Sequence, residues 1–161
     1  MSNCIDRRRC EKFSGGSIMY NELKTSFLAK IENLPMARSI TTLFLMELDL
    51  PNAIVNELKT AISEAVTNAI VHGYTNDESK SVYMNLSYDN YNIYAEVIDY
   101  GIGISDIEQA QEPLFTTKKD EERSGLGFTI MNVFTDELDV ISRVNEGTKI
   151  TMVKNYIMYK S

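Results

Sequence analysis

The sequence predicts an α+β fold in which helices pack on a sheet. Three observations support this class. Residues 52–74 carry apolar side chains at intervals of three and four, the spacing of a helix that packs on a sheet. Residues 81–99 alternate polar and apolar side chains around Asp89, which predicts a β-hairpin. Residues 137–156 add two further strands around an Asn-Glu-Gly turn.

Two shorter elements precede the long helix. Residues 20–30 alternate weakly and are typical of a strand at the edge of a sheet. Asn33 is placed to cap the helix that follows, with Pro35 in its first turn. Pro51 then lies at the start of the long helix, and Gly73 is placed to end it in a left-handed cap.

The later part of the chain is rich in glycine turns and short helices. Residues 106–111 form a short helical segment. Residues 112–124 combine threonines, lysines and acids with little to bury, which predicts a mobile loop. Gly125-x-Gly127 then opens a helix over residues 128–134. The sequence contains no internal repeat.

Length and charge restrict the class of protein. The 161 residues suit a single domain, which we place at residues 19–161. The net charge of −7 argues against nucleic acid as the direct ligand, because binding to phosphate backbones needs a basic surface. No apolar run is long enough to span a membrane. The two cysteines, Cys4 and Cys10, form no framework, so a reducing cytoplasm is the expected location.

Residues 1–18 differ from the rest of the chain. They contain an arginine run and a Gly-Gly pair but no periodic apolar pattern. We expect either a disordered leader or translated upstream sequence, with Met19 as the true start. Mass spectrometry of the native protein would decide between the two, because a peptide that spans Met19 excludes the second.

Several polar and glycine motifs follow one another in a specific order. Glu64 and Asn68 lie one turn apart on a helix, and alone they are most often a solvated pair. Glycine pairs alone are most often tight turns. Their order and spacing together indicate a nucleotide-phosphate site. The full set is Glu64, Asn68, Asp99, Gly101, Gly103, Gly125, Gly127, Gly147 and Thr148.

Three segments carry a family resemblance: residues 63–74, 113–118 and 122–131. They resemble the ATP-binding superfamily of DNA gyrase, heat-shock chaperones, histidine kinases and MutL. Within it, the chain is most similar to the anti-sigma F factor family, which are small serine protein kinases of endospore-forming bacteria. The resemblance covers Met19 to about Tyr156. It implies a two-layer α/β sandwich of the Bergerat type, in which helices cover one face of a mixed, mostly antiparallel sheet.

The resemblance implies ATP and Mg²⁺ as cofactors and assigns roles to single residues. Asn68 would hold Mg²⁺ through its carbonyl oxygen. Glu64 would accept the proton of the attacking serine hydroxyl. Asp99, helped by Thr148, would accept a hydrogen bond from the adenine amino group. Further ATP contacts, including those of a lid, would come from Gly101, Gly103, Thr116, Thr117, Lys118, Arg123, Ser124, Gly125 and Gly127.

The implied function is an ATP-dependent serine kinase that binds a sporulation sigma factor of the F type and phosphorylates its anti-anti-sigma antagonist. A homodimer is implied as well, and Arg38 is either a partner contact or a solvated arginine.

Two alternatives stay open: an anti-sigma kinase of a stress-response switch, and a nucleotide-gated binding module without phosphotransfer. A detached histidine-kinase domain is disfavoured, because His72 lies inside the helix that carries Glu64. Tyr100 replaces a small or acidic residue and is expected to alter the adenine pocket.

Overall fold

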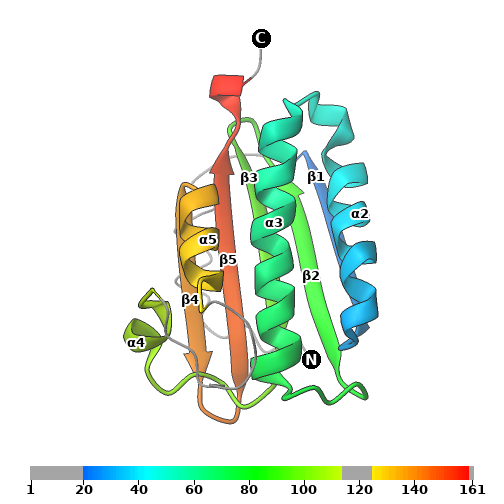
Figure 1. Cartoon of the computed structure of the whole chain (residues 1–161). Coiled ribbons are helices and arrows are strands. Elements are labelled where there is room, and N and C mark those ends of the chain that lie inside the picture. Colours follow the sequence, from blue (N-terminus) through cyan, green and yellow to red (C-terminus); the bar gives the residue numbers. More distant parts are fainter. Residues whose placement is uncertain (1–19, 114–124, 160–161) are drawn as a thin grey trace.

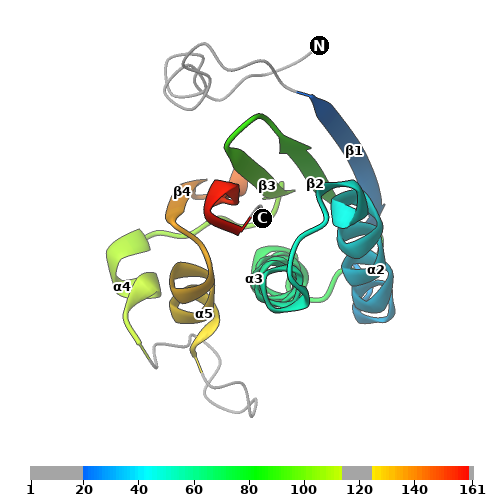
Figure 2. The ribbon, with the colours of Figure 1, turned by 90° about the horizontal axis from the view of Figure 1, so that it is seen from above.

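The computed structural model describes residues 20–113 and 125–159. Helices α2, α3 and α5 lie side by side on one face of a five-stranded sheet (Figures 1 and 2). This confirms the predicted fold class. The elements are β1 (Asn21–Leu28), η1 (Ile31–Asn33), α2 (Leu34–Leu45), η2 (Met46–Leu48), α3 (Asn52–Asn68), η3 (Ala69–Gly73), β2 (Ser81–Tyr88), β3 (Asn92–Asp99), α4 (Ile107–Gln111), α5 (Gly127–Phe134), β4 (Glu137–Arg143), β5 (Gly147–Asn155) and η4 (Ile157–Tyr159).

The strand order is β1-β2-β3-β5-β4, and each neighbouring pair of described strands is antiparallel. The predicted hairpin is β2 and β3, and the predicted edge strand is β1. Strand β5 returns between β3 and β4, so that β3 and β5 pair along their whole length. This pairing sets Asp99 at the end of β3 directly opposite Thr148. Two residues 49 positions apart in the sequence therefore meet at one end of the sheet.

The core lies between the sheet and helix α3. Alternate residues of the hairpin point toward the helices and are almost fully buried, among them Val82, Met84 and Leu86. The facing stripe of α3 carries small residues such as Ala61 and Ala65, which allow the helix to approach the strands closely. Burial of each large apolar side chain contributes about 1.5–3 kcal/mol relative to exposure. The predicted apolar stripe is thus the packing face of α3.

The end of α3 differs from the prediction. The helix passes into a π-helical turn, η3, in which the N–H of Tyr74 donates to the carbonyl of Ala69 at 2.9 Å. Gly73 does not form the left-handed cap predicted from the sequence, because positive φ angles occur instead at Thr75 (51°) and Asn76 (64°). Gly73 serves a different purpose: it lets the end of this helix approach the end of strand β3.

The prediction for Asn33 was half right. It is the residue before α2, and Pro35 lies in the first turn as expected. The Asn33 side chain does not cap the helix, because its Nδ2 donates to the carbonyl of Leu28 at 2.9 Å. The sequence pattern located the helix start correctly but could not foresee a competing acceptor at the end of β1.

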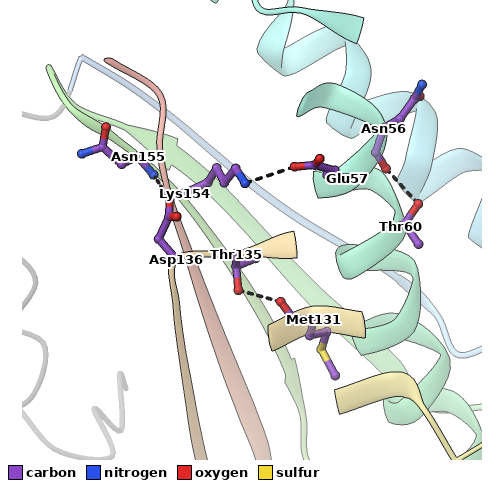
Figure 3. A network of polar contacts seen from close by, with 8 residues as sticks. All are labelled: Asn56, Glu57, Thr60, Met131, Thr135, Asp136, Lys154 and Asn155. Atoms are coloured by element: carbon purple, nitrogen blue, oxygen red, sulfur yellow. Dashed lines mark hydrogen bonds and ion pairs between the residues drawn. The ribbon is translucent and has the colours of Figure 1, made fainter. Parts of the chain in front are cut away.

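A polar network holds the start of α3 against the end of β5 (Figure 3). The Nζ of Lys154 lies 3.1 Å from the Oε2 of Glu57, and its side chain is only 7% exposed. The same ammonium lies 5.9 Å from the ring centre of Tyr159, a favourable cation–π geometry. The backbone N–H of Asn155 donates to Asp136 at 2.6 Å beside it. The Lys154–Glu57 pair fixes α3 at the end opposite to Glu64 and Asn68, and the other two contacts hold the end of β5.

None of the helices within residues 20–113 and 125–159 is long and apolar enough to cross a membrane.

Candidate nucleotide-binding site

A cavity of about 800 Å³ opens where α3 ends, α5 begins and strands β3 and β5 meet. Most of the predicted site residues that the structure describes line it. These are Glu64, Asn68, Asp99, Gly103, Gly125, Gly127 and Thr148. The cavity volume lies within the range of small-molecule and cofactor sites in proteins. Residues separated by up to 84 positions in the sequence are therefore brought to a single concave site.

Helices α3 and α5 face each other at one wall of this cavity. A Cβ atom placed on Gly127 would lie 3.2 Å from the Oε2 of Glu64 and 3.4 Å from the Nδ2 of Asn68. Gly127 is the first residue of α5, where the backbone N–H groups of a helix have no partner within the helix. A carboxylate, a carboxamide and a helix N-terminus that favours anions are thus adjacent.

Asp99 is buried beside the cavity, with 6% of its surface exposed. Its Oδ1 accepts the N–H of Gly101 at 2.9 Å, and its carboxylate also accepts the N–H of Thr148. Burial raises the pKa of Asp99 from 3.8 to about 6, although the two N–H groups act in the opposite direction. A desolvated carboxylate at this place is a strong acceptor for a ligand N–H group.

Close backbone packing brings Asp99 to the cavity. A Cβ atom on Gly101 would lie 1.9 Å from the carbonyl oxygen of Gly73, a distance that excludes any side chain. A Cβ atom on Gly73 would lie 2.7 Å from the Asp99 carboxylate. The end of η3 and the end of β3 are therefore in direct backbone contact. Gly101 was predicted to contact ATP, whereas the close approach that it allows in the structure is to the carbonyl of Gly73.

Thr116, Thr117, Lys118, Arg123 and Ser124, predicted as lid residues, are outside the described residues. Gly101 is half-buried next to the cavity rather than in its wall.

Arg38 lines a second cavity of about 310 Å³ between α2 and α3, together with Leu34, Pro35, Ser39, Thr42 and Lys59. Leu34 lines both this cavity and the larger one. Arg38 therefore lies outside the larger cavity.

Tyr100 does not line the cavity, contrary to the expectation that it alters the pocket. The residue is 60% exposed, and its ring packs edge-on against Tyr83, with ring centres 5.5 Å apart. The alternation of β3 places this side chain on the sheet face opposite to the helices, away from Asp99.

Several cavity residues were not predicted from the sequence. His72 lies one turn after Asn68 and lines the same wall, so its spacing from Glu64 and Asn68 was the available signal. Asp106 lines the cavity too, and its Oδ1 caps α4 by accepting the N–H of Gln109 at 2.9 Å. The other missed residues are mainly apolar and carry no motif: Ile31, Leu34, Thr67, Ala69, Gly73, Ile102, Ile104, Ser105, Gln109, Ala110, Leu126, Phe128 and Ile150.

Comparison with known proteins agrees with this geometry. Residues 27–154 match the family described as the histidine kinase-like ATPase domain. The fold is that of an ATP-binding domain of this class. The chain is 43% identical over 143 residues to the anti-sigma F factor of Anoxybacillus flavithermus, covering 89% of this chain and 98% of that protein. It is 49% identical over 136 residues to the anti-sigma F factor of Clostridium perfringens, covering 84% and 97%. The chain belongs to the anti-sigma F factor family.

Two solved structures share the fold. The RsbU and RsbW domains of a Mycobacterium tuberculosis protein match with a TM-score of 0.61 and 20% identity, over 83% of this chain and 32% of that chain. The histidine kinase domain of a blue-light activated kinase from Erythrobacter litoralis matches with a TM-score of 0.51 and 18% identity, over 80% and 61%. At these identities the likeness concerns the fold alone.

Asp99 makes the stability of the protein depend on pH. Its pKa is higher in the folded state than in the unfolded chain, so the folded state loses stability as pH rises from about 4 to about 6. Above that range the burial of the charge costs about 3 kcal/mol. We expect Asp99→Asn to raise the free energy of unfolding at pH 7.5 by about 1–3 kcal/mol and to weaken ATP binding.

Thermal melts at pH 7.5 and pH 4.5, together with calorimetric titration of ATP, test this prediction. The gain in stability should shrink at the lower pH, where Asp99 of the unmodified protein is largely protonated. A gain that is equal at both pH values would contradict the raised pKa. Unchanged ATP affinity would remove Asp99 from the ligand contacts.

Proposed function

We propose that this protein binds Mg-ATP in the cavity at the end of α3 and transfers the γ-phosphoryl group to a serine of an anti-anti-sigma protein. We also propose that it binds a sigma factor of the F type. The contact between Gly127 and the pair Glu64 and Asn68 carries this proposal. It sets a carboxylate and an amide oxygen beside a helix N-terminus suited to phosphate.

The oxygen-rich wall of α3 suits the metal. Asn68 lines the cavity and would hold Mg²⁺ through its Oδ1, a hard oxygen ligand. The ion would neutralise charge on the phosphate oxygens. Gly125 and Gly127 leave the start of α5 open, so backbone N–H groups can donate to phosphate oxygens there.

Glu64 is the proposed general base. It is half-buried in the cavity wall beside Asn68 and the first turn of α5. A serine hydroxyl entering from the open side would meet the carboxylate next to the bound phosphates, and Glu64 would take its proton as the phosphoryl group moves. A domain that only binds nucleotide has less need of a carboxylate at this position.

Asp99 is the residue proposed to recognise the adenine base. Its carboxylate accepts N–H groups from Gly101 and Thr148 and would accept the adenine amino group from the cavity. The N–H donors hold the carboxylate in one orientation, which favours a ligand with a donor at a fixed place. We also propose that five lid residues contact ATP: Thr116, Thr117, Lys118, Arg123 and Ser124.

Incubation with radiolabelled ATP and an anti-anti-sigma protein from a spore-forming bacterium tests the activity. Transfer of label to a serine of the added protein is the expected result. Binding of ATP without transfer would favour the nucleotide-gated binding module. Transfer to the antagonist of a stress-response sigma factor, but not to that of the sporulation factor, would favour the stress-response switch.

The groove around Arg38 is the proposed partner surface. Arg38 is exposed there, and Lys59 lies in the same hollow, so a local positive site stands on a chain whose net charge is −7. Such a site suits an acidic side chain of a partner protein. We propose that the partners dock here, that the protein is a homodimer and that it acts in the cytoplasm.

We expect Arg38→Ala to weaken binding of the sigma factor or of the anti-anti-sigma protein about 10- to 30-fold, because arginines at interface centres are frequent hot spots. ATP affinity should stay unchanged, since Arg38 lies outside the nucleotide cavity. Arg143→Ala is the matched control, because Arg143 at the end of β4 is also exposed but pairs with Glu146 in the turn that follows. Equal losses in both variants would exclude a specific contact.

A further inference from the structure

Tyr74, directly after η3, links three segments that meet behind the cavity. The residue is buried, with 6% of its surface exposed. Its hydroxyl donates to the carbonyl oxygen of Ser81 at 2.6 Å and accepts the backbone N–H of Tyr100 at 2.9 Å. Burial raises the pKa of Tyr74, so the hydroxyl is protonated and able to donate at neutral pH. The side chain thus joins the end of α3 to the start of β2 and the end of β3.

The register of β2 and β3 shows which hydrogen bond of the sheet the Tyr74 hydroxyl replaces. Strands β2 and β3 pair from Tyr88 opposite Ile93 to Tyr83 opposite Ile98. Continued by two residues, the same register would set Ser81 opposite Tyr100. The N–H of Asp89 donates to the carbonyl of Asn92, so odd-numbered residues of β2 belong to the hydrogen-bonded pairs of this ladder.

In a regular ladder, the N–H of Tyr100 would therefore donate directly to the carbonyl of Ser81. The Tyr74 hydroxyl occupies that position and replaces one hydrogen bond by two. Both backbone groups keep a partner, yet the two strands are held apart by the width of an oxygen atom. The hydroxyl acts as a spacer in the sheet, in the way that a bridging water does.

The separation coincides with the point where the chain leaves the sheet. Directly after Tyr100, Gly101 packs on the carbonyl of Gly73, and the N–H of Ile102 donates to that same carbonyl at 2.9 Å. The segment that contains Asp99 is thus held by Gly73 on one side and by Tyr74 on the other. Both anchors come from the end of the helix that carries Glu64 and Asn68.

We infer that Tyr74 is a positioning residue for base recognition: its hydroxyl holds the end of β3 out of the ladder and so aims the Asp99 carboxylate at the nucleobase. The inference rests on the proposed role of Asp99. Without the hydroxyl, the N–H of Tyr100 either pairs directly with Ser81 or loses its partner. In both cases the residues directly after Asp99 shift, while the contacts around Asn68 and Gly127 at the proposed phosphate end of the cavity stay in place.

The test uses the full chain with Tyr74→Phe and two probes, ATP and purine riboside 5′-triphosphate, which lacks the exocyclic amino group. Calorimetry gives the ratio of the two dissociation constants. The unmodified protein should bind ATP on the order of 10-fold or more tightly, because a hydrogen bond to a carboxylate is at stake. In Tyr74→Phe the ratio should fall to within about 3-fold, with the affinity for the amino-free probe unchanged.

Tyr83→Phe is the matched control, because it removes a tyrosine hydroxyl from β2 next to Tyr100 without touching the Tyr74 bridge. Its ratio should equal that of the unmodified protein. A Tyr74→Phe variant that binds both probes less tightly, with an unchanged ratio, would reduce Tyr74 to a general structural role and overturn the inference.

Two further results separate the inference from the function on which it rests. If the unmodified protein does not discriminate between the probes, the role of Asp99 fails and the inference falls with it. Hydrogen exchange of the Tyr100 amide in the unmodified chain tests whether this amide has a hydrogen-bond partner at all, independently of any variant. Protection of this amide is expected, and exchange at the rate of a free peptide would overturn the inference even if Asp99 reads the base.

Discussion

Glu64→Gln is expected to lower the turnover of phosphotransfer by roughly 10²- to 10⁴-fold, the range for loss of a positioned general base. Glutamine keeps the size of the side chain and its contact with the first turn of α5, where a Cβ atom on Gly127 would lie 3.2 Å from the Oε2 of Glu64. It cannot take the proton of a serine hydroxyl. Single-turnover transfer of label from ATP to an anti-anti-sigma protein measures the effect.

The affinity for ATP should change little in the same variant, since the amide of Asn68 and the start of α5 stay in place. Glu137→Gln is the control, because Glu137 is exposed on β4 and does not line the cavity. A Glu64→Gln protein that turns over at the normal rate would exclude Glu64 as the base. A loss of ATP binding equal to the loss of turnover would make Glu64 a binding residue.

Gly101→Ala is expected to lower the free energy of unfolding by about 3 kcal/mol or more and to abolish measurable ATP binding. The added methyl group would lie 1.9 Å from the carbonyl oxygen of Gly73, which is backbone and cannot rotate away. The end of β3 would have to leave η3, and the Asp99 carboxylate would move with it. Denaturant melts and calorimetric titration of ATP measure the two effects.

Gly127→Ala provides the contrast for stability. Its added methyl group would meet only side-chain atoms, at 3.2 Å or more, and alanine is favoured over glycine within a helix. Its unfolding midpoint should therefore stay close to that of the unmodified protein. Similar midpoints for Gly101→Ala and Gly127→Ala would refute the close packing of η3 against the end of β3.

Much of this architecture could be predicted from the sequence because local periodicity and burial agree. The alternation of the hairpin and the three-four spacing of the long helix each correspond to the face that is buried in the structure. The failures arose where tertiary neighbours compete with local rules. The Asn33 side chain donates to a backbone carbonyl of β1 and therefore does not cap α2. The turn after Asn68 forms a π-helix instead of ending the helix.

Only part of the candidate site could be predicted from the sequence, and its arrangement could not. Glu64, Asn68 and Asp99 stood out because their spacing from the glycine motifs was specific. Tyr74 did not, since the use of its hydroxyl depends on the register of β2 and β3, which no pattern within residues 63–74 reveals. The apolar residues of the cavity wall could not be predicted either, because nothing in the sequence distinguishes Ile104 and Ile150 from core residues.

Leu34 at the start of α2 lines both the nucleotide cavity and the groove around Arg38. The two hollows share this residue, so enlarging or trimming it would reshape both together. A phenotype from such a change could not be attributed to nucleotide or to protein partner alone. Experiments meant to separate the two functions should leave Leu34 intact and vary Arg38 or Asp99 instead.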